Sequence, residues 1–316
     1  MKMATPRRTG LTLILLFVGA LSNVGCGNDD LLWARLGVAA ALNTPALVDI
    51  QSNIEYAARE TTPLHLDLYR PVIRTQPLPL VIVIHGGSWR SGSKEDMAEF
   101  AYDLAAHGMI AASVDYRLIQ QGGTFPAPVL DAMDAAAFLR DRAADFGIDP
   151  DRLAALGVSA GGHLALMSGM VDDFSKLDAT RPTGRTFDFK AIVNIEGPAD
   201  FTVDPAAYSS RQIRLIEGFL GKTIADDPDG SHRRLASPVI YARETGPPVL
   251  TIHGTADQTV PFAQAQALEA ALEAAREPHS FIPIQGMDHI PGALWLGPYV
   301  QGYREAMLDF LKNALQ

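Results

Sequence analysis

The sequence predicts an α/β protein whose mostly parallel sheet is covered by helices on both faces. Apolar runs of strand length, rich in Val, Ile and Leu and lacking polar alternation, indicate strands that are buried on both sides. Stretches with helical periodicity separate these runs, as the crossovers between parallel strands require. A small polar insertion at 199–246 follows the sixth predicted strand, at the sheet edge where loops form binding sites.

The predicted elements alternate along the chain. Strands are expected first at 54–56 and 64–69, where apolar and polar residues alternate, and then at 80–84, where they do not. The remaining strands are expected at 110–114, 152–156, 190–195, 248–252 and 280–284, and the helices at 96–107, 126–146, 162–167, 264–276 and 302–315.

Composition divides the chain into three parts. We expect residues 1–25 to be a signal peptide, 26–48 a tether and 49–316 one globular domain that includes the insertion. With 47% apolar and 20% charged residues, the chain has ample material for a large core.

The first residues resemble a bacterial lipoprotein signal. Lys2, Arg7 and Arg8 precede the apolar stretch 11–21, which is too short to cross a bilayer comfortably. Cys26 would then be the acylated first residue of an exported protein held at the cell envelope, with membrane contact through this anchor only. Cleavage without a lipid and an uncleaved helix are the alternatives.

Charge and cysteine content exclude several classes of partner and site. A net charge of -10 and a pI near 5.2 argue against a nucleic-acid partner. A single cysteine excludes an internal disulfide and a multi-thiolate metal site. Because metal-ligand spacings and the P-loop and dinucleotide fingerprints are absent, we expect neither a metal nor another cofactor. The oligomeric state stays open.

The pattern G-x-S-x-G at 157–161 carries the first chemical signal. An apolar strand precedes it and a helical pattern follows it, so Ser159 stands at a sharp turn with its hydroxyl exposed. The first amides of the following helix, beginning at Ala160, favour negative charge near that serine. An ordinary glycine-rich turn between a strand and a helix is the alternative interpretation.

A second glycine motif, His85-Gly86-Gly87-Ser88-Trp89, comes directly after a buried strand. Its two glycines allow the backbone to turn amides toward a ligand without a Cβ in the way. The alternative is a plain turn, with His85 and Trp89 packed as supports.

Three residue types needed for nucleophilic catalysis follow predicted strands. A serine hydroxyl needs a base to take its proton, and the base works best when an acid orients it. Ser159, Asp257 and His289 each lie just past the C-terminal end of a strand, so a parallel sheet would bring them together. Their order along the chain is that of the α/β-hydrolases.

These motifs together resemble those of a known family. Residues from about 50 to 316 are similar to α/β-hydrolase-fold esterases of the carboxylesterase and hormone-sensitive-lipase-like superfamily, in a group with H-G-G-x-W in place of H-G-G-G. The matching segments are 85–89, Asp115-Tyr116-Arg117-Leu118, Phe125-Pro126-Ala127, 157–163, and His253-Gly254 with Asp257 and Val260-Pro261.

The resemblance implies a role for each site residue. Ser159 would be the nucleophile, His289 the base and Asp257 the acid that orients the base. The oxyanion hole would be formed by backbone amides, namely those of Gly86, Gly87, Ser88 and Ala160.

Other polar residues near the predicted strand ends are weaker candidates. Asp288 and Asp200 are alternatives to Asp257 as the acid. Glu196 could contact substrate, but we expect a salt bridge to an arginine. We expect His163 to be packed and hydrogen-bonded, and His232 to be solvated.

The sequence therefore predicts a serine carboxylic-ester hydrolase that acts through an acyl-enzyme on a small-molecule ester. Short-chain or acetyl esters are favoured because the insertion shows no large hydrophobic lid. Alternatives are a formamidase or peptidase-type amide hydrolase of the same fold, since kynurenine formamidases share H-G-G-x-W, and a non-catalytic binding protein with a hydrolase fold.

Overall fold

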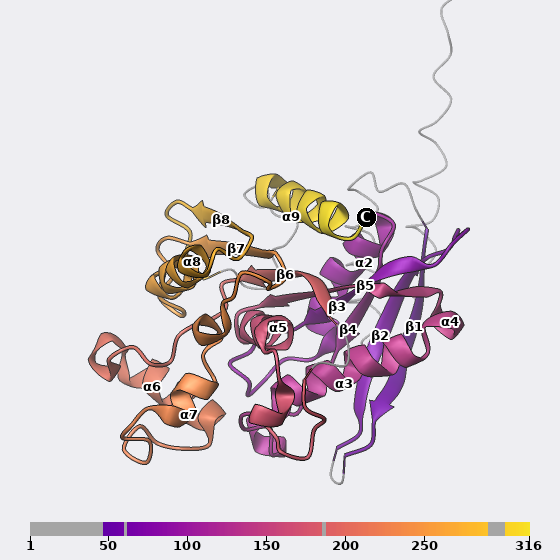
Figure 1. Cartoon of the computed structure of the whole chain (residues 1–316). Helices are drawn as coiled ribbons and strands as arrows, with labels where there is room; N and C mark the ends of the chain where they lie inside the picture. The colour runs from indigo at the N-terminus through magenta and orange to yellow at the C-terminus, as the bar shows by residue number, and fades with distance from the viewer. Residues whose placement is uncertain (1–46, 60–61, 185–187, 290–300) are drawn as a thin grey trace, which may run out of the picture.

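One mixed sheet forms the centre of the computed structural model, which describes residues 47–59, 62–184, 188–289 and 301–316 (Figure 1). Its strand order is β1-β2-β4-β3-β5-β6-β7-β8. The strands are β1 (Val48–Ala57), β2 (Leu64–Pro71), β3 (Leu78–Ile84), β4 (Ile110–Val114), β5 (Ile148–Val158), β6 (Phe189–Ile195), β7 (Val249–Gly254) and β8 (His279–Ile284).

Among the described strands, only β2 runs against the others. β2 is antiparallel to both β1 and β4, whereas β4, β3, β5, β6, β7 and β8 are parallel to their neighbours. In β3, Leu80, Ile82 and Ile84 pack into one core and Val81 and Val83 into the other. Successive side chains of a strand point to opposite faces, so a run without polar residues is suited to a sheet covered on both sides.

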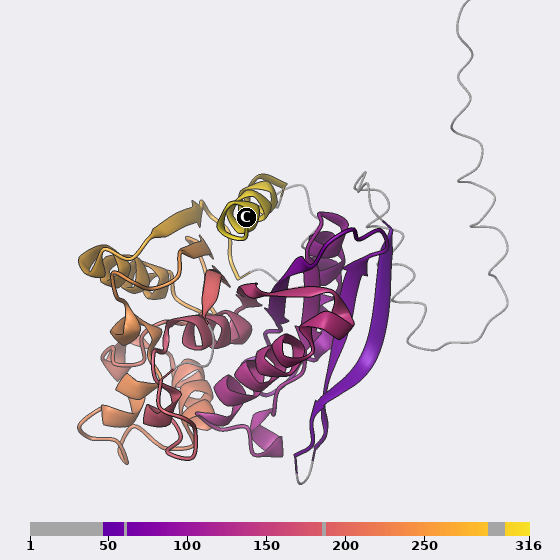
Figure 2. The same cartoon turned by 45° about the vertical axis from the view of Figure 1, so that its right-hand side comes forward.

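Helices cover both faces, as predicted (Figures 1 and 2). Side chains of α2 and α9 belong to one core, and those of α3, α5 and α8 to the other. The helices of these layers are α2 (Ala98–Ala106), α3 (Ala127–Asp141), α4 (Ala143–Phe146), α5 (Ala160–Met170), α8 (Ala263–Ala275) and α9 (Gln301–Ala314). Short 3-10 turns join them, namely η1 (Lys94–Met97), η2 (Ile119–Gln121) and η3 (Phe174–Lys176).

The segment 199–246 between β6 and β7 contains helices that the sequence did not predict. They are η4 (Pro205–Ala207), α6 (Ser210–Leu220), α7 (Ser231–Leu235) and η5 (Pro238–Tyr241). Ser209 and Gln212 form a capping box at the start of α6, and the helix buries Ile216, Phe219 and Leu220. The sequence of α6 is mostly polar, with only one narrow apolar face, and for this reason the helix was not recognised from the sequence.

The expected signal peptide, Cys26 and nearly all of the expected tether lie outside the described residues. In the part of the chain that is described, no helix is long and apolar enough to cross a membrane.

Candidate active site

Ser159 occupies the sharp turn between β5 and α5. Its φ of 57° and ψ of -120° are unusual for a residue other than glycine. A Cβ added at Gly157 would collide with the carbonyl of Gly161, and one added at Gly161 would collide with the carbonyl of Ile84. The glycines of the motif therefore allow helix and strand to approach closely, which presents the serine at the C-terminal edge of the sheet.

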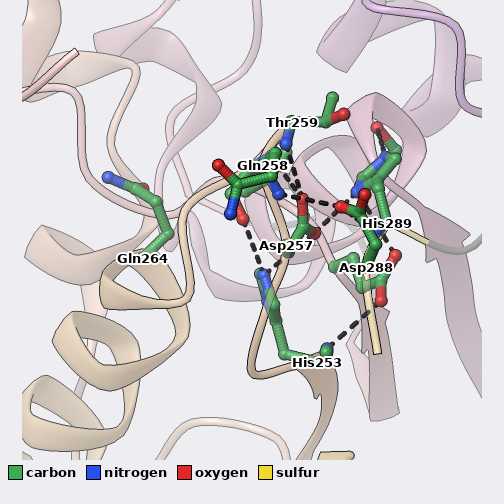
Figure 3. A network of polar contacts seen from close by, with 12 residues as sticks. His253, Asp257, Gln258, Thr259, Gln264, Asp288 and His289 are labelled. Atoms are coloured by element: carbon green, nitrogen blue, oxygen red, sulfur yellow. Dashed lines mark hydrogen bonds and ion pairs between the residues drawn. The ribbon is translucent and has the colours of Figure 1, made fainter. Parts of the chain in front are cut away.

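The structure brings Ser159, Asp257 and His289 together. His289 Nε2 lies 3.0 Å from Ser159 Oγ. His289 Nδ1 lies 2.7 Å from Asp257 Oδ2 (Figure 3). With the Nδ1 proton donated to Asp257, Nε2 is left to accept the serine proton. This is the arrangement of a nucleophile, a base and an orienting acid.

Asp257 is held on both of its oxygens. Its Oδ1 accepts hydrogen bonds of 2.8 Å from the amides of Thr259 and Val260, and its Oδ2 lies 3.3 Å from His253 Nε2 (Figure 3). Burial by itself raises the pKa of Asp257, but hydrogen bonds from His253 and His289 outweigh it and hold the pKa well below the ordinary value. The carboxylate is therefore ionised at neutral pH.

The environment of His289 favours its protonated form. Burial lowers the pKa of His289, but the hydrogen bond and charge of Asp257, together with the charges of Glu196 and Asp288, raise it above its ordinary value of 6.5. The imidazolium that forms when the base takes a proton is thus stabilised.

Glu196 makes a contact that the sequence analysis missed. Its side chain is fully buried, its Oε1 accepts a hydrogen bond of 3.2 Å from the Gly254 amide, and its Oε2 lies 3.3 Å from His289 Nδ1. We expected a salt bridge to an arginine, whereas the structure places this carboxylate beside the base. The signal available was its position at the end of a strand next to β5.

The two alternative acids, Asp288 and Asp200, accept hydrogen bonds from loop residues instead. Asp288 Oδ1 accepts hydrogen bonds from the amides of Gln258 and His289, at 2.9 and 2.7 Å, so it joins the loops that carry the acid and the base. Asp200 accepts from the amide and hydroxyl of Thr202, which closes a local turn.

Of the two remaining histidine predictions, one is confirmed and the other is wrong. His163 is fully buried and its Nε2 lies 2.8 Å from the carbonyl oxygen of Ala236, as expected of a packed, hydrogen-bonded residue. The prediction that His232 is solvated was wrong. This side chain is half-buried, packs against the ring of Phe125 and has its Nε2 3.0 Å from the carbonyl oxygen of Leu220.

The second glycine motif lies against Ser159. A Cβ added at Gly86 would be 3.2 Å from Ser159 Cβ. Gly87 and Ser88 have positive φ angles of 111° and 54°, which turn the chain sharply after β3. Within the described chain, the amides of Gly87, Ser88 and Ala160 donate to no other group. These amides can therefore serve an oxyanion.

His85 supports this turn, as the alternative interpretation expected of it. Its ring stacks on Tyr116 with centroids 4.3 Å apart, and its Nδ1 lies 2.7 Å from the carbonyl oxygen of Gly86. Burial lowers the pKa of His85 to about 4, so the ring is neutral at pH 7 and donates its Nδ1 proton to that carbonyl.

A cleft with about 470 Å³ of open space lies beside the nucleophile. Its floor comes from the two glycine motifs, and one wall comes from the segment 199–246, chiefly from α6. In the described residues its lining is Ser88, Trp89, Ser159, Ala160, Pro198, Phe201, Tyr208, Gln212, Leu215, Ile216, Thr259, Val260, Pro261 and Gln264. The sequence did not predict the contribution of α6, although the capping box at Ser209 was a signal for that helix.

One set of side chains in the described residues has atoms spaced as metal ligands could be. Ligand atoms of Glu196, Asp257 and His289 all lie within 4.8 Å of one another, a proximity that spacing along the chain does not reveal. The hydrogen bond between Asp257 and His289 accounts for most of this proximity without an ion. The ring nitrogen that would bind a cation is the one that carries the proton.

Comparison with known families finds a match to the BD-FAE family over residues 66–272. Among curated relatives, the chain is 31% identical over 228 residues to esterase LipC of Mycobacterium tuberculosis, covering 71% of this chain and 56% of LipC. It is 26% identical over 257 residues to isoprenylcysteine alpha-carbonyl methylesterase ICME of Arabidopsis thaliana, covering 79% and 58%. The chain thus spans about half the length of the curated relatives it matches.

Solved structures with the same architecture are known. A truncated carbohydrate esterase from gut microbiota superposes with a TM-score of 0.73 at 24% identity, covering 86% of this chain and 98% of the other. Esterase 2 of Thermogutta terrifontis gives 0.67 at 25% identity, covering 85% and 92%. The predicted α/β-hydrolase fold, with its mostly parallel sheet, is confirmed.

Proposed function

The chain belongs to the BD-FAE family, and from this premise we propose that it is a serine carboxylic-ester hydrolase that works through an acyl-enzyme. The observation that carries the proposal is the position of His289, with Nε2 3.0 Å from Ser159 Oγ and Nδ1 2.7 Å from Asp257. The similarity to esterase LipC supports the same class of reaction.

The reaction begins when Ser159 Oγ attacks the ester carbonyl while His289 Nε2 takes its proton. The amides at Gly86, Gly87, Ser88 and Ala160 receive the negative charge that develops on the carbonyl oxygen. His289 then gives its proton to the leaving alcohol, which leaves an acyl group on the serine. Water attacks that acyl group in the second half, with His289 again acting as base.

The pH dependence follows from the charge of His289. Only the neutral ring can accept the serine proton, and its pKa lies above 6.5 because of the neighbouring carboxylates. Activity should therefore fall as the pH is lowered through this raised value.

The cleft favours a small acyl or alcohol group. Leu215 and Ile216 from α6 line the cleft together with Ser159, and the lining is mostly apolar. Short-chain or acetyl esters suit such walls, because these side chains occupy space in the same cleft as the serine.

The test is hydrolysis of p-nitrophenyl acetate and p-nitrophenyl octanoate by the protein and by Ser159→Ala. We expect turnover of the acetate in preference to the octanoate and a loss of about 10⁴-fold or more in the variant, as removal of a triad nucleophile causes. Activity restricted to an N-formyl amide would replace the esterase with an amide hydrolase. Equal inactivity of both proteins on all substrates would favour a binding protein.

We also propose that the protein is exported and anchored by a lipid on Cys26. The support is the sequence alone, with its basic start, short apolar stretch 11–21 and following cysteine. Mass spectrometry of the mature N-terminus tests this proposal. An acylated Cys26 is expected, and an unmodified terminus upstream of Cys26 would refute the anchor.

A further inference from the structure

We propose that Glu196 is a second acid of this site, a positioning residue that acts on the substrate through His289. The inference rests on the proposed function, because it concerns the same base. Glu196 has two effects: it stabilises the imidazolium of His289, and it holds the ring in the tautomer that carries its proton on Nδ1.

The strand order brings the second carboxylate to the base. Glu196 directly follows β6, and β6 lies between β5, which leads to Ser159, and β7, which leads to Asp257. Its Oε2 is 3.3 Å from His289 Nδ1, the same nitrogen that lies 2.7 Å from Asp257 Oδ2. One ring nitrogen therefore faces two carboxylates from neighbouring strands.

The carboxylate of Glu196 is fixed in place. Its backbone amide donates to the carbonyl of Ile252 at 2.9 Å, and its Oε1 accepts from the amide of Gly254 at 3.2 Å. Both contacts are to β7, and the side chain is fully buried. Solvent therefore does little to screen its charge from the ring.

Glu196 also has an unusual backbone conformation. Glu196 has a φ of 54°, in the left-handed region that glycine adopts more readily. Ser88 and Ser159, which follow β3 and β5, share this feature with φ angles of 54° and 57°. Such conformations are concentrated at functional sites, and here they occur after three adjacent strands of the sheet.

Several charged or titratable groups surround His289. Asp257 and Glu196 face Nδ1, and Asp288 is the sequence neighbour of His289. Burial, and after it the charge of Glu196, raises the pKa of the Tyr303 phenol on α9. His253 contacts Asp257 rather than His289. Among these groups, Glu196 is the buried acid whose removal leaves the Asp257 hydrogen bond to the base intact.

The first experiment compares Glu196→Gln, Glu196→Asp and the wild type. We expect the glutamine variant to move the acid limb of the kcat/KM profile, measured with p-nitrophenyl acetate, to lower pH by about one unit, because an opposite charge beside the ring is lost. The aspartate variant keeps the charge and should retain a limb near that of the wild type. A purely structural role would affect the rate without moving the limb.

A matched control removes a buried carboxylate elsewhere. Glu277 is 2% exposed and accepts a hydrogen bond of 2.8 Å from the Arg243 amide. Glu277→Gln should leave the acid limb where it is in the wild type. An unchanged limb in Glu196→Gln, or an equal shift in both variants, would overturn the proposal.

The second experiment uses Asp257→Asn as a background. Loss of the sole orienting acid of a triad costs about 10⁴-fold in kcat because the base adopts the wrong tautomer. Here Glu196 Oε2 lies 3.3 Å from Nδ1 and can take over as acceptor of its proton, so we expect a smaller loss in Asp257→Asn. Adding Glu196→Gln should then reduce kcat at least about tenfold more than it does in the wild type, since residues acting as a unit are not additive. If Glu196→Gln lowers kcat by the same factor in the wild type and in Asp257→Asn, its role in holding the tautomer is refuted.

A titration of the labelled His289 ring by NMR separates this inference from the esterase proposal, since it needs no substrate. A lower pKa in Glu196→Gln than in the wild type supports the second acid even if no ester is hydrolysed. An identical pKa in the two proteins refutes it even if the wild type is an active esterase.

Discussion

Phe219→Ala tests whether the segment 199–246 supports the turn at 86–89, whose amides are proposed to bind the oxyanion and which we call the oxyanion turn. Phe219 lies on α6, is fully buried and stacks on Trp89 with ring centroids 4.2 Å apart. The rings of His163, Phe125 and Phe201 surround it at 5.0, 5.9 and 6.1 Å. Truncation to alanine therefore opens a cavity directly behind the turn that carries the Gly87 and Ser88 amides.

The size of the effect follows from this packing. Truncation of a buried phenylalanine costs about 3–5 kcal/mol, and the stacked pair with Trp89 places Phe219 toward the upper end, at about 4 kcal/mol or more. Misplacement of catalytic groups by ~1 Å can cost about 100-fold in rate, so we expect kcat to fall at least tenfold as Trp89 loses its support.

Urea unfolding monitored by tryptophan fluorescence gives the stability, and p-nitrophenyl acetate hydrolysis gives kcat. Phe219→Leu is the matched control, because it retains most of the apolar volume and should cost no more than about 1.5 kcal/mol. A Phe219→Ala protein within about 1 kcal/mol of the wild type, with unchanged kcat, would refute the coupling of α6 to the oxyanion turn.

Two further predictions concern the frame around the site. Gly161→Ala places a Cβ against a backbone oxygen of β3 and should cost about 3 kcal/mol or more and abolish activity, whereas Gly218→Ala makes an ordinary contact and should stabilise α6 by about 1 kcal/mol. Urea unfolding compares them, and equal effects would contradict the steric argument. Burial raises the pKa of Asp103, but hydrogen bonding by His107 and Arg304 holds it below its ordinary value. This carboxylate contributes most to stability above about pH 4 and less as the pH falls below that. Asp103→Asn should therefore cost about 3 kcal/mol at pH 6 and less at pH 3. A difference in unfolding free energy between the two proteins that does not change with pH would exclude the charge as the cause.

Local sequence patterns were sufficient for the strands and for three site residues. The buried runs of β3, β5, β6 and β7 are mostly apolar and of strand length, so composition and length identify them without tertiary information. Ser159, Asp257 and His289 could be placed because each follows such a run or a strand parallel to it. The first strand was predicted too short, at 54–56 instead of Val48–Ala57, because half of its residues are exposed.

Features that depend on contacts between distant parts of the chain could not be predicted from the sequence. The contact between Glu196 and His289 requires β6 to lie beside β7, which spacing along the chain does not show. The wall of the cleft depends on α6, a mostly polar helix whose narrow apolar face packs on Trp89. His232 was predicted to be solvated because its neighbours in sequence are polar, although its contacts come from Leu220 and Phe125.

The position of β8 at the edge of the sheet affects how the site can lose its geometry. In the described part of the chain β8 is an edge strand that pairs only with β7, and all of its residues are half-buried or exposed. Edge elements with few buried contacts open by local fluctuations that leave the rest of a protein folded. His289 follows this strand, whereas Ser159 follows the central strand β5. His289, the proposed base, is therefore the member of the proposed triad with the least cooperative support. Fraying at this edge would separate it from Ser159 and stop the proposed reaction in a molecule that is otherwise native.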